Sequence, residues 1–384
     1  MSNRRWVLAA TLAAAAGLCV PAATASAHMQ IGVFDEGEAF FDDTAAVFAR
    51  YQALRVQVLR VSLYWGGRLG VAKIRPFDAA DPRDAGYDWS LYDRTVTYAG
   101  ASGIKVLFSI TGTPRWANGG ESTNRPPLNY DDLRAFAYAA AARYSGTYIG
   151  ADGRTLPAVH LWAAWNEPNN PAFLRPQYVR KGGKWVIQSA VAYAKICNAV
   201  YTGVHATMFQ GEQVACGVTG PRGNNNPGSV RPSVSPIAFL DAAKRAGMKT
   251  FDAYAHNPYY GMPTETPATK PPPTRSGQAP TAVTLANIDT LTTEISRLYG
   301  PKKLWITEYG YQTNPPDPQF GVSWALQAKY LTQAFAIARK NPRIDMMLWF
   351  LVRDEPIISG WQSGLVTADG RKKPAFSAFQ RLTG

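Results

Sequence analysis

The stretch VHLWAAWNEPN at residues 159–169 joins a short apolar run to a polar end that carries one glutamate. Such a run, rich in Val, Leu and Trp and bounded by Pro168, predicts a buried strand, because strands covered on both faces are apolar throughout. The stretch KLWITEYG at residues 303–310 has the same form and also ends in a glutamate. The two stretches therefore predict a parallel sheet with Glu167 and Glu308 at strand ends.

Outward from these stretches, short apolar runs alternate with longer amphipathic segments. Strands are expected at 30–33, 56–63, 105–110, 159–165, 213–217, 250–255, 303–307 and 346–351. Helices are expected at 41–53, 89–101, 129–143, 184–203, 236–246, 284–299, 321–340 and 373–382. Eight strands, each followed by a helix, predict an α/β fold: a single (β/α)8 TIM barrel with enlarged loops at the carboxyl ends of its strands. A doubly wound open sheet is the alternative, but it normally has a Gly-rich loop after its first strand, and IGVFD at residues 31–35 supplies none.

Two loops, 218–235 and 261–283, interrupt the alternation and are rich in Asn, Pro and Gly. Each follows a predicted strand, so in a barrel each lies on the face where active sites are built. We expect both to form cleft walls. The alternative is a domain linker, but neither flank can complete a core without the other.

Residues 1–27 have the form of a secretory signal peptide, and residues 28–384 are expected to form the barrel domain. Arg4 and Arg5 precede an apolar run from Trp6 to Val20, and a small-residue cleavage site, ASA, follows at residues 25–27. The arginine pair also fits twin-arginine export, so the route stays open. The sequence therefore predicts a secreted, extracellular protein.

Charge and composition limit the classes of binding partner that the sequence supports. Because residues 1–27 hold two arginines and no acid, residues 28–384 carry 38 Lys and Arg against 27 Asp and Glu, a net charge of +11. No run of five Lys or Arg occurs, which argues against nucleic acid. After residue 27 no apolar run approaches the roughly 18 residues needed to span a membrane. The excess charge would favour anionic cell-surface polymers or an acidic glycan, and the sequence carries no signal for an oligomeric state.

Cysteine and histidine are scarce. Beyond the expected signal segment only Cys197 and Cys216 remain, which form either a disulfide or two separately buried thiols. Two cysteines and four histidines cannot build a histidine-rich zinc site without many carboxylates. We therefore expect no metal, and the acid and base chemistry considered next requires no cofactor.

The two strand-end glutamates suit acid and base chemistry. When two carboxyl groups share a cleft, one can hold a proton while the other stays ionised. Glycoside hydrolysis needs such a pair, because the leaving oxygen is protonated while the anomeric carbon is attacked or stabilised. A lone glutamate is usually solvated surface, whereas two at matching strand ends favour catalysis.

WNEPN at residues 165–169 and WITEYG at residues 305–310 resemble the two signatures of the retaining glycoside hydrolases of clan A. The resemblance is closest to family 39 and its bacterial exopolysaccharide-cleaving relatives. It implies that Glu167 is the general acid and base and that Glu308 is the nucleophile. It covers nearly all of residues 28–384, with supporting motifs GTPRWA at residues 112–117, GLV at 364–366 and KPA at 373–375.

Four further residues are candidates for substrate binding. Arg60 would keep Glu308 ionised, although it also suits an ordinary structural ion pair. Asn166 would bind a sugar hydroxyl or simply cap the strand end. His256 would hydrogen-bond the nucleophile or substrate, or be a structural histidine. Tyr259 is preferred over the neighbouring tyrosine for the aromatic position that the resemblance implies.

Three tryptophans near strand ends, Trp349, Trp65 and Trp116, are expected to be platforms on which the C–H faces of sugars pack. Trp162 and Trp305 lie inside strands and are expected in the core. The sequence thus predicts a secreted retaining glycosidase acting on an oligo- or polysaccharide. The alternative is a catalytically inactive carbohydrate-binding barrel at the cell surface.

Overall fold

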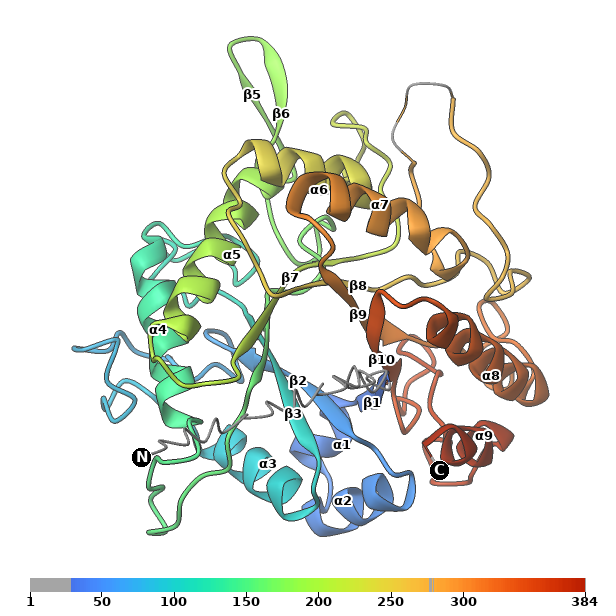
Figure 1. Ribbon diagram of the computed structural model, residues 1–384, viewed down its shortest axis with the longest axis horizontal. Helices are drawn as coiled ribbons and strands as arrows, with labels where there is room; N and C mark the ends of the chain where they lie inside the picture. The colour runs from blue at the N-terminus through green and yellow to red at the C-terminus, as the bar shows by residue number, and fades with distance from the viewer. Residues whose placement is uncertain (1–28, 276–277, 279, 384) are drawn as a thin grey trace, which may run out of the picture.

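The protein folds into a closed barrel of eight parallel strands with helices outside it (Figure 1). A computed structural model describes residues 29–275, 278 and 280–383. Around the barrel the strands are β1 (Gln30–Phe34), β2 (Val58–Tyr64), β3 (Lys105–Thr111), β4 (Leu161–Ala164), β7 (Gln213–Thr219), β8 (Ala253–His256), β9 (Lys303–Tyr309) and β10 (Ile344–Phe350), and β10 pairs with β1. The predicted (β/α)8 barrel is confirmed, while the expected signal peptide lies outside the described residues.

The helices follow the strands in alternation and cover the barrel wall (Figure 1). They are α1 (Glu36–Phe41), α2 (Thr44–Ala53), α3 (Ser90–Ala101), α4 (Tyr130–Arg143), α5 (Gln188–His205), α6 (Pro236–Arg245), the 3₁₀ turn η1 (Leu285–Asn287), α7 (Ile288–Tyr299), α8 (Trp324–Lys340) and α9 (Pro374–Thr383). None of the helices in the part of the chain that the structure describes is long and apolar enough to cross a bilayer.

The core has two layers, as the alternation of side chains along strands requires. One cluster fills the barrel with inward side chains from seven strands, among them Leu107, Leu161, Trp305 and Leu348. The larger cluster lies between the strands and the helices and contains Trp162. Trp162 and Trp305 are therefore core residues, as predicted.

The parallel register brings the carboxyl ends of all eight strands to one rim. Phe34 at the end of β1 pairs with Phe350 at the end of β10, and Tyr64 at the end of β2 pairs with Thr111 of β3. Glu308 is the penultimate residue of β9, and Glu167 follows β4 by three residues. Both glutamates therefore lie at the same end of the barrel.

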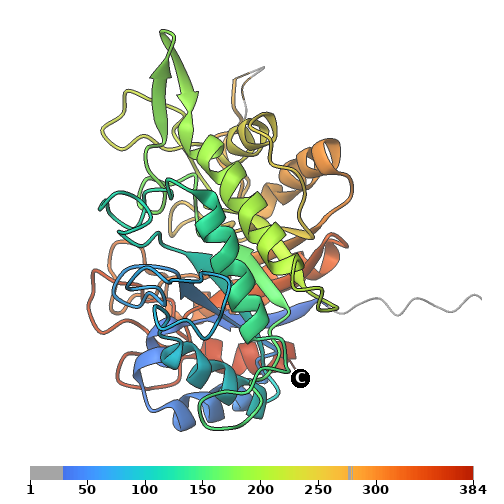
Figure 2. The same ribbon diagram turned by 90° about the vertical axis from the view of Figure 1, so that its left-hand side faces the viewer.

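The predicted helix at 184–203 is wrong in its first turn. Residues 178–187 form an antiparallel hairpin of β5 (Tyr178–Lys181) and β6 (Lys184–Ile187), and α5 begins only at Gln188. The turn residues Gly182 and Gly183 both have positive φ, which a tight hairpin turn requires and glycine adopts without strain. The hairpin projects beyond the body of the molecule (Figures 1 and 2).

The predicted helix at 41–53 is also shorter than expected. Asp43 accepts a hydrogen bond from the Ala46 amide at 3.0 Å and caps α2, which begins at Thr44. The preceding turn forms the separate helix α1, which begins directly after β1. This early start places Glu36 at the strand-end rim.

Cys197 of α5 and Cys216 of β7 form a disulfide, with their Cα atoms 5.8 Å apart. Both residues are fully buried. The sequence left a disulfide and two separate thiols open, and the structure shows the disulfide. It ties the helix after the hairpin to the barrel wall.

Candidate active site

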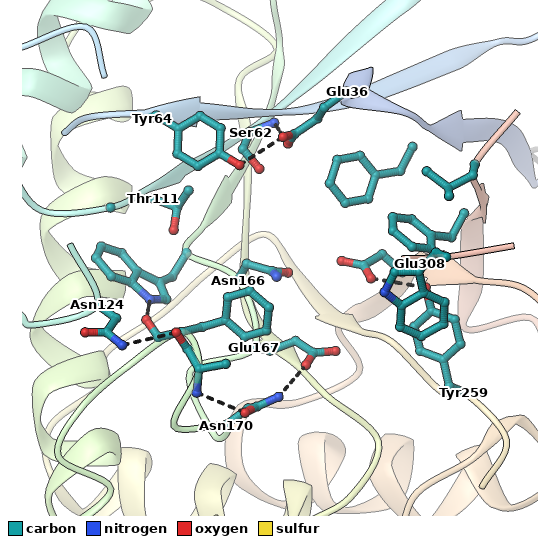
Figure 3. Close-up of a pocket in the computed structure, with 18 of the residues that line it drawn as sticks. Glu36, Ser62, Tyr64, Thr111, Asn124, Asn166, Glu167, Asn170, Tyr259 and Glu308 are labelled. Atoms are coloured by element: carbon teal, nitrogen blue, oxygen red, sulfur yellow. Dashed lines mark hydrogen bonds between the residues drawn. The ribbon is translucent and has the colours of Figure 1, made fainter. Parts of the chain in front are cut away.

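A pocket of about 670 Å³ opens at the carboxyl-end rim, and both predicted glutamates line it (Figure 3). Four carboxylates face this pocket, from Glu36, Glu167, Glu308 and Glu355. Among the described residues that line it, the one cationic side chain is that of Arg231. The pocket is thus acidic, although the chain as a whole is strongly basic.

Glu308 is buried and held at both carboxylate oxygens. Its Oε1 accepts a hydrogen bond from Arg60 Nη1 at 2.7 Å, and its Oε2 accepts one from the Tyr259 hydroxyl at 3.1 Å. A guanidinium at this distance stabilises the ionised carboxylate. The side chain is therefore fixed in position and paired with a permanent cation.

Arg60 is fully buried and connects the two strand ends. Its Nη2 donates to Asn166 Oδ1 at 2.8 Å, and its Nε donates to Ser109 Oγ at 2.9 Å. The ring of Phe34 lies 4.4 Å from its guanidinium carbon. Because the guanidinium fork is planar and rigid, these contacts fix Glu308 relative to Asn166.

Glu167 accepts from two amides, and no cation among the described residues comes within 4.0 Å of its carboxylate. Its Oε2 accepts from Asn170 Nδ2 at 3.1 Å, and its Oε1 accepts from Asn257 Nδ2 at 3.2 Å. Asn257 is itself oriented by the Thr307 hydroxyl, which donates to its Oδ1 at 2.7 Å. A neutral amide is a weaker stabiliser of a carboxylate than a guanidinium, so Glu167 is the easier of the two to protonate.

The backbone around Glu167 adopts conformations that are unfavourable for residues with side chains. Trp165 and Glu167 have φ values of 72° and 36°, left-handed conformations that cost side-chain-bearing residues roughly 1–3 kcal/mol. Gly220, after β7, lies so close that an added Cβ would be 2.8 Å from the Glu167 carboxyl carbon. A glycine is therefore needed at this position for the carboxylate to lie where it does.

The pKa values of the two carboxyl groups reflect these surroundings. Burial, followed by the nearby charge of Glu308, raises the pKa of Glu167 to about 7. Burial also raises the pKa of Glu308, but the Arg60 guanidinium and the Tyr259 hydroxyl oppose that rise. At neutral pH the arrangement favours an ionised Glu308 beside a Glu167 that can hold a proton.

The structure brings five predicted residues together. Glu167, Glu308, Asn166 and Tyr259 line the pocket, and Arg60 lies directly behind Glu308. In Figure 3 the carboxylates of the two glutamates project into the same space from different strands. This set can hold a proton, a carboxylate and a fixed cation around one substrate.

His256 belongs to the wall and does not line the pocket. It is fully buried, its Nε2 lies 3.0 Å from the Val283 carbonyl, and its Nδ1 lies 2.8 Å from the Thr219 hydroxyl. Since a carbonyl can only accept, Nε2 carries the proton and Nδ1 accepts from the hydroxyl. Burial lowers the pKa of His256 to about 4. The structural alternative is therefore the correct one.

The three predicted tryptophan platforms are not in the pocket. Trp349 is fully buried and donates from Nε1 to the Ser363 carbonyl at 2.9 Å. Trp65 is also fully buried, with its ring 5.6 Å from that of Trp116. Trp116 donates to the Ala72 carbonyl at 2.9 Å. The expectation of sugar platforms at these positions is wrong.

At two of these positions the predicted aromatic residue is one position away from the residue that lines the pocket. Phe350 and Tyr64 line the pocket, and each is the sequence neighbour of a predicted tryptophan. Successive side chains of a strand point to opposite faces, so the neighbours Trp349 and Trp65 point into the helix layer. The exposed indole at the pocket is Trp361, in the loop after β10.

Sequence reasoning missed the lining residues Glu36, Tyr64, Asn170 and Trp361, and it missed Asn257, which is buried behind the pocket and donates to Glu167. Asn170 directly follows WNEPN, and Asn257 directly follows the candidate His256, so their positions along the chain were usable signals. Glu36 follows β1 by two residues and could have been found by reading that strand end as well. Trp361 lies in an irregular loop, for which the sequence offered no comparable rule.

The two long loops differ in their contribution. The loop 218–235 supplies Pro221 and Arg231 to the pocket, as expected of a cleft wall. The described part of 261–283 supplies none of its lining residues. It supports the first loop instead, through an ion pair at 3.1 Å between Glu265 and Arg222. In the described part of the chain no group of three or more His, Cys, Asp or Glu residues is placed to hold a metal ion.

No protein-family model matches the chain, and no curated protein matches it significantly. Solved structures do match in fold. One is a family 39 glycoside hydrolase from Bacteroides cellulosilyticus WH2, with a TM-score of 0.63 and 18% identity over 93% of this chain and 64% of that one. A glucosidase from Croceicoccus marinus has a TM-score of 0.65 and 13% identity over 93% and 67% of the two chains.

A monomeric β-xylosidase from Caulobacter crescentus CB15 matches with a TM-score of 0.59 and 17% identity over 93% of this chain and 67% of that one. The chain thus spans about two thirds of the length of the solved proteins it matches. At these identities the likeness concerns architecture. The chain shares the (β/α)8 barrel fold of these solved glycoside hydrolases.

Proposed function

We propose that the protein is a retaining glycoside hydrolase that cleaves O-glycosidic bonds of an oligo- or polysaccharide. The observation that carries the proposal is the pair of carboxylates in one pocket with opposite surroundings. Glu308 accepts a hydrogen bond from the Arg60 guanidinium, whereas among the described residues Glu167 has only amide partners. The fold shared with a glucosidase and a xylosidase supports the same class of reaction.

In the proposed first step Glu308 attacks the anomeric carbon. Arg60 and Tyr259 hold the attacking carboxylate still, and burial removes the water that would otherwise solvate it. Glu167, whose pKa is raised to about 7, donates its proton to the leaving oxygen. The anomeric carbon–oxygen bond breaks as a bond to the Glu308 carboxylate forms.

In the second step Glu167, now ionised, takes a proton from a water molecule that attacks the same carbon. The bond to Glu308 breaks, and the sugar leaves with its original anomeric configuration after two inversions. Asn166 lines the pocket next to Glu167 in the chain, and its Oδ1 accepts a hydrogen bond from Arg60. Its side-chain amide is placed to donate to a ring hydroxyl of the sugar.

The proposal is tested with activated aryl glycosides. Replacing Glu308 by Gly should abolish hydrolysis, and added azide should restore turnover with a glycosyl azide of inverted configuration. In Glu167→Ala, azide should give the retained configuration, because the covalent intermediate still forms. Full activity of either variant without azide would refute the assignment. Binding of glycans without product from the wild type would favour the inactive carbohydrate-binding barrel.

We further propose that the protein is secreted after removal of residues 1–27. The sequence pattern of that segment and the Cys197–Cys216 disulfide support this, because disulfides persist in oxidising compartments. Expression of the full chain should yield extracellular protein that begins at His28. N-terminal sequencing checks this, and an uncleaved protein retained in the cell would contradict it.

A further inference from the structure

Glu36 is a third carboxylate in the pocket, and the proposed mechanism does not use it. It is the first residue of α1, and its carboxylate is held from β2. Its Oε1 accepts from the Ser62 amide at 2.7 Å, and its Oε2 accepts from the Tyr64 hydroxyl at 2.9 Å. Figure 3 shows this group across the pocket from Glu167 and Asn170.

Glu36 has no ion-pair partner among the described residues. No Lys, Arg or His nitrogen there comes within 4.0 Å of its carboxylate, and Arg60 is committed to Glu308. Removing a carboxylate from water without a counter-ion is costly. Accordingly, burial raises the pKa of Glu36. An acid in the first turn of α1 is favourable for the helix, but the described part of the chain supplies no close counter-ion for its charge.

The roles proposed for Glu167 and Glu308 indicate which part of the substrate lies near Glu36. Glu167 gives its proton to the leaving oxygen, so the leaving group lies on the Glu167 side of the bond. The sugar that becomes attached to Glu308 then extends toward the opposite wall, where Glu36 lies (Figure 3). Each Glu36 oxygen has accepted one hydrogen bond from the protein and has capacity for another.

We propose that Glu36 is a specificity-determining residue that accepts hydrogen bonds from hydroxyl groups of the glycone and excludes a glycone that carries a carboxylate. The inference rests on the proposed function and names its substrate class: the sugar cleaved off is uncharged. The carboxylates of Glu308 and Glu355, which line the same pocket, act in the same direction. The acidic glycan suggested by the net charge therefore does not fit this part of the pocket.

The test is calorimetric binding of two iminosugars, 1-deoxynojirimycin and its counterpart in which the hydroxymethyl group is a carboxylate. Both carry the same ring ammonium, so Glu167 and Glu308 attract both equally. The wild type should bind the hydroxymethyl form at least tenfold more tightly. In Glu36→Gln that preference should fall at least tenfold, because the repulsive charge is gone while the amide oxygen can still accept from Ser62.

Glu121→Gln, which removes an exposed charge outside the pocket, is the matched control and should leave the preference unchanged. Thermal unfolding of each variant verifies the fold. The inference is overturned if the wild type prefers the carboxylate form, if it binds neither probe, or if the preference survives in Glu36→Gln. Because binding needs no turnover, these outcomes are separate from the loss of hydrolysis expected in Glu308 variants.

A separate charge feature lies on the β5–β6 hairpin. No acidic residue occurs between Glu167 and Glu212 in the sequence. The hairpin tip is exposed over residues 180–185, which include three cations and Trp185, and that indole is 51% exposed. The Arg180 guanidinium carbon lies 5.4 Å from the indole ring. No carboxylate among the described residues pairs with the three cations.

The hairpin continues directly from the segment that carries Glu167 and lines the pocket as far as Phe173. It therefore stands on the leaving-group side and projects outward (Figure 2). We propose that the hairpin tip binds an anionic polysaccharide, with its cations contacting carboxylate or phosphate groups and Trp185 packing on a sugar ring. The charged units then lie outside the acidic pocket.

Affinity electrophoresis in gels containing polygalacturonate tests this proposal, with dextran and DNA as comparison polymers. The wild type should be retarded by polygalacturonate and not by dextran. A variant with Arg180, Lys181 and Lys184 replaced by Ala should lose at least tenfold in affinity, and Trp185→Ala should lose several-fold. Glu308→Gln should bind as the wild type does.

The matched control removes three exposed cations from α8, at Lys329, Arg339 and Lys340. If this control loses as much affinity as the hairpin variant, net charge and not the hairpin is responsible, and the proposal is wrong. Tighter binding to DNA than to polygalacturonate, or no retardation of the wild type, would also overturn it.

Discussion

Two buried ion pairs in this barrel have the same length and differ in what surrounds them. Arg60 and Glu308 are 2.7 Å apart, as are Lys373 and Asp354. Lys373 also donates to the Thr313 hydroxyl at 2.8 Å, and both members of its pair are shut off from solvent. Glu308 keeps an edge open to the pocket. Burial and pairing are therefore common to both carboxylates, and what sets Glu308 apart is its open edge in the pocket that it shares with Glu167.

The largest expected effect is a loss of activity when the Arg60–Glu308 pair is changed. Glu308→Gln should lower kcat by at least about 10⁴-fold, because the amide cannot form the covalent intermediate. Its thermal unfolding should remain close to that of the wild type, since Gln keeps the shape and accepts from Arg60. Steady-state kinetics with aryl glycosides measure the loss. A fall of less than tenfold would mean that Glu308 is merely structural, like Asp354.

Breaking the Lys373–Asp354 pair should lower the stability of the fold. Lys373→Met leaves Asp354 buried without its cation, which should cost about 3–5 kcal/mol of unfolding free energy. Urea unfolding followed by tryptophan fluorescence measures this. The residual folded protein should keep a KM near that of the wild type, because Lys373 does not line the pocket. An unchanged unfolding midpoint would show that the closed pair contributes little.

A third prediction concerns pH. With a pKa of about 7, Glu167 is protonated below that pH and loses its proton above it. The kcat/KM for substrates with poor leaving groups should therefore fall above about pH 7, approaching tenfold per unit. Asn170→Ala removes a hydrogen bond that lowers this pKa, so the fall should move to higher pH. A profile that is the same in Glu167→Gln would exclude Glu167 as the acid.

The barrel and the two glutamates could be predicted because they depend on local patterns. An apolar run that ends in a glutamate predicts both a strand and the position of its carboxyl end. Parallel strands then bring their carboxyl ends together. The hairpin at Gly182 and Gly183 was also readable, since a glycine pair between β-type segments is a hairpin signal. It was missed because the apolar pattern of α5 was extended too far toward its N-terminus.

The remaining site depended on information that local patterns lack. A one-residue shift at a strand end decides whether Trp349 or Phe350 meets the pocket, and hydrophobicity is the same for both. Glu36 is held by Ser62, 26 positions away, so its environment appears only when β1 and β2 pair. Trp361 reaches the pocket on a loop whose path is set by tertiary contacts. One of them is the hydrogen bond that the Trp361 backbone N–H donates to the Glu355 carboxylate.

The smallest expected effect tests this corrected assignment of aromatics. Trp361→Ala should raise KM by about 2–10-fold, the range expected for losing one ring that packs on a sugar. Trp349→Phe should leave KM unchanged and instead lower stability, because it removes the indole hydrogen bond to Ser363. The opposite pattern, with KM sensitive to Trp349 and not to Trp361, would restore the prediction made from the sequence.

The central claim is that Glu308 forms a covalent bond to the sugar, and intact-protein mass spectrometry tests it most directly. The protein is incubated with 2,4-dinitrophenyl 2-deoxy-2-fluoro-β-glycosides of glucose and xylose, whose intermediates hydrolyse slowly. We predict a mass increase of one fluorosugar per chain, on the peptide that contains Glu308, and none in Glu308→Gln. Labelling of Glu167 or of a residue outside the pocket would contradict the account.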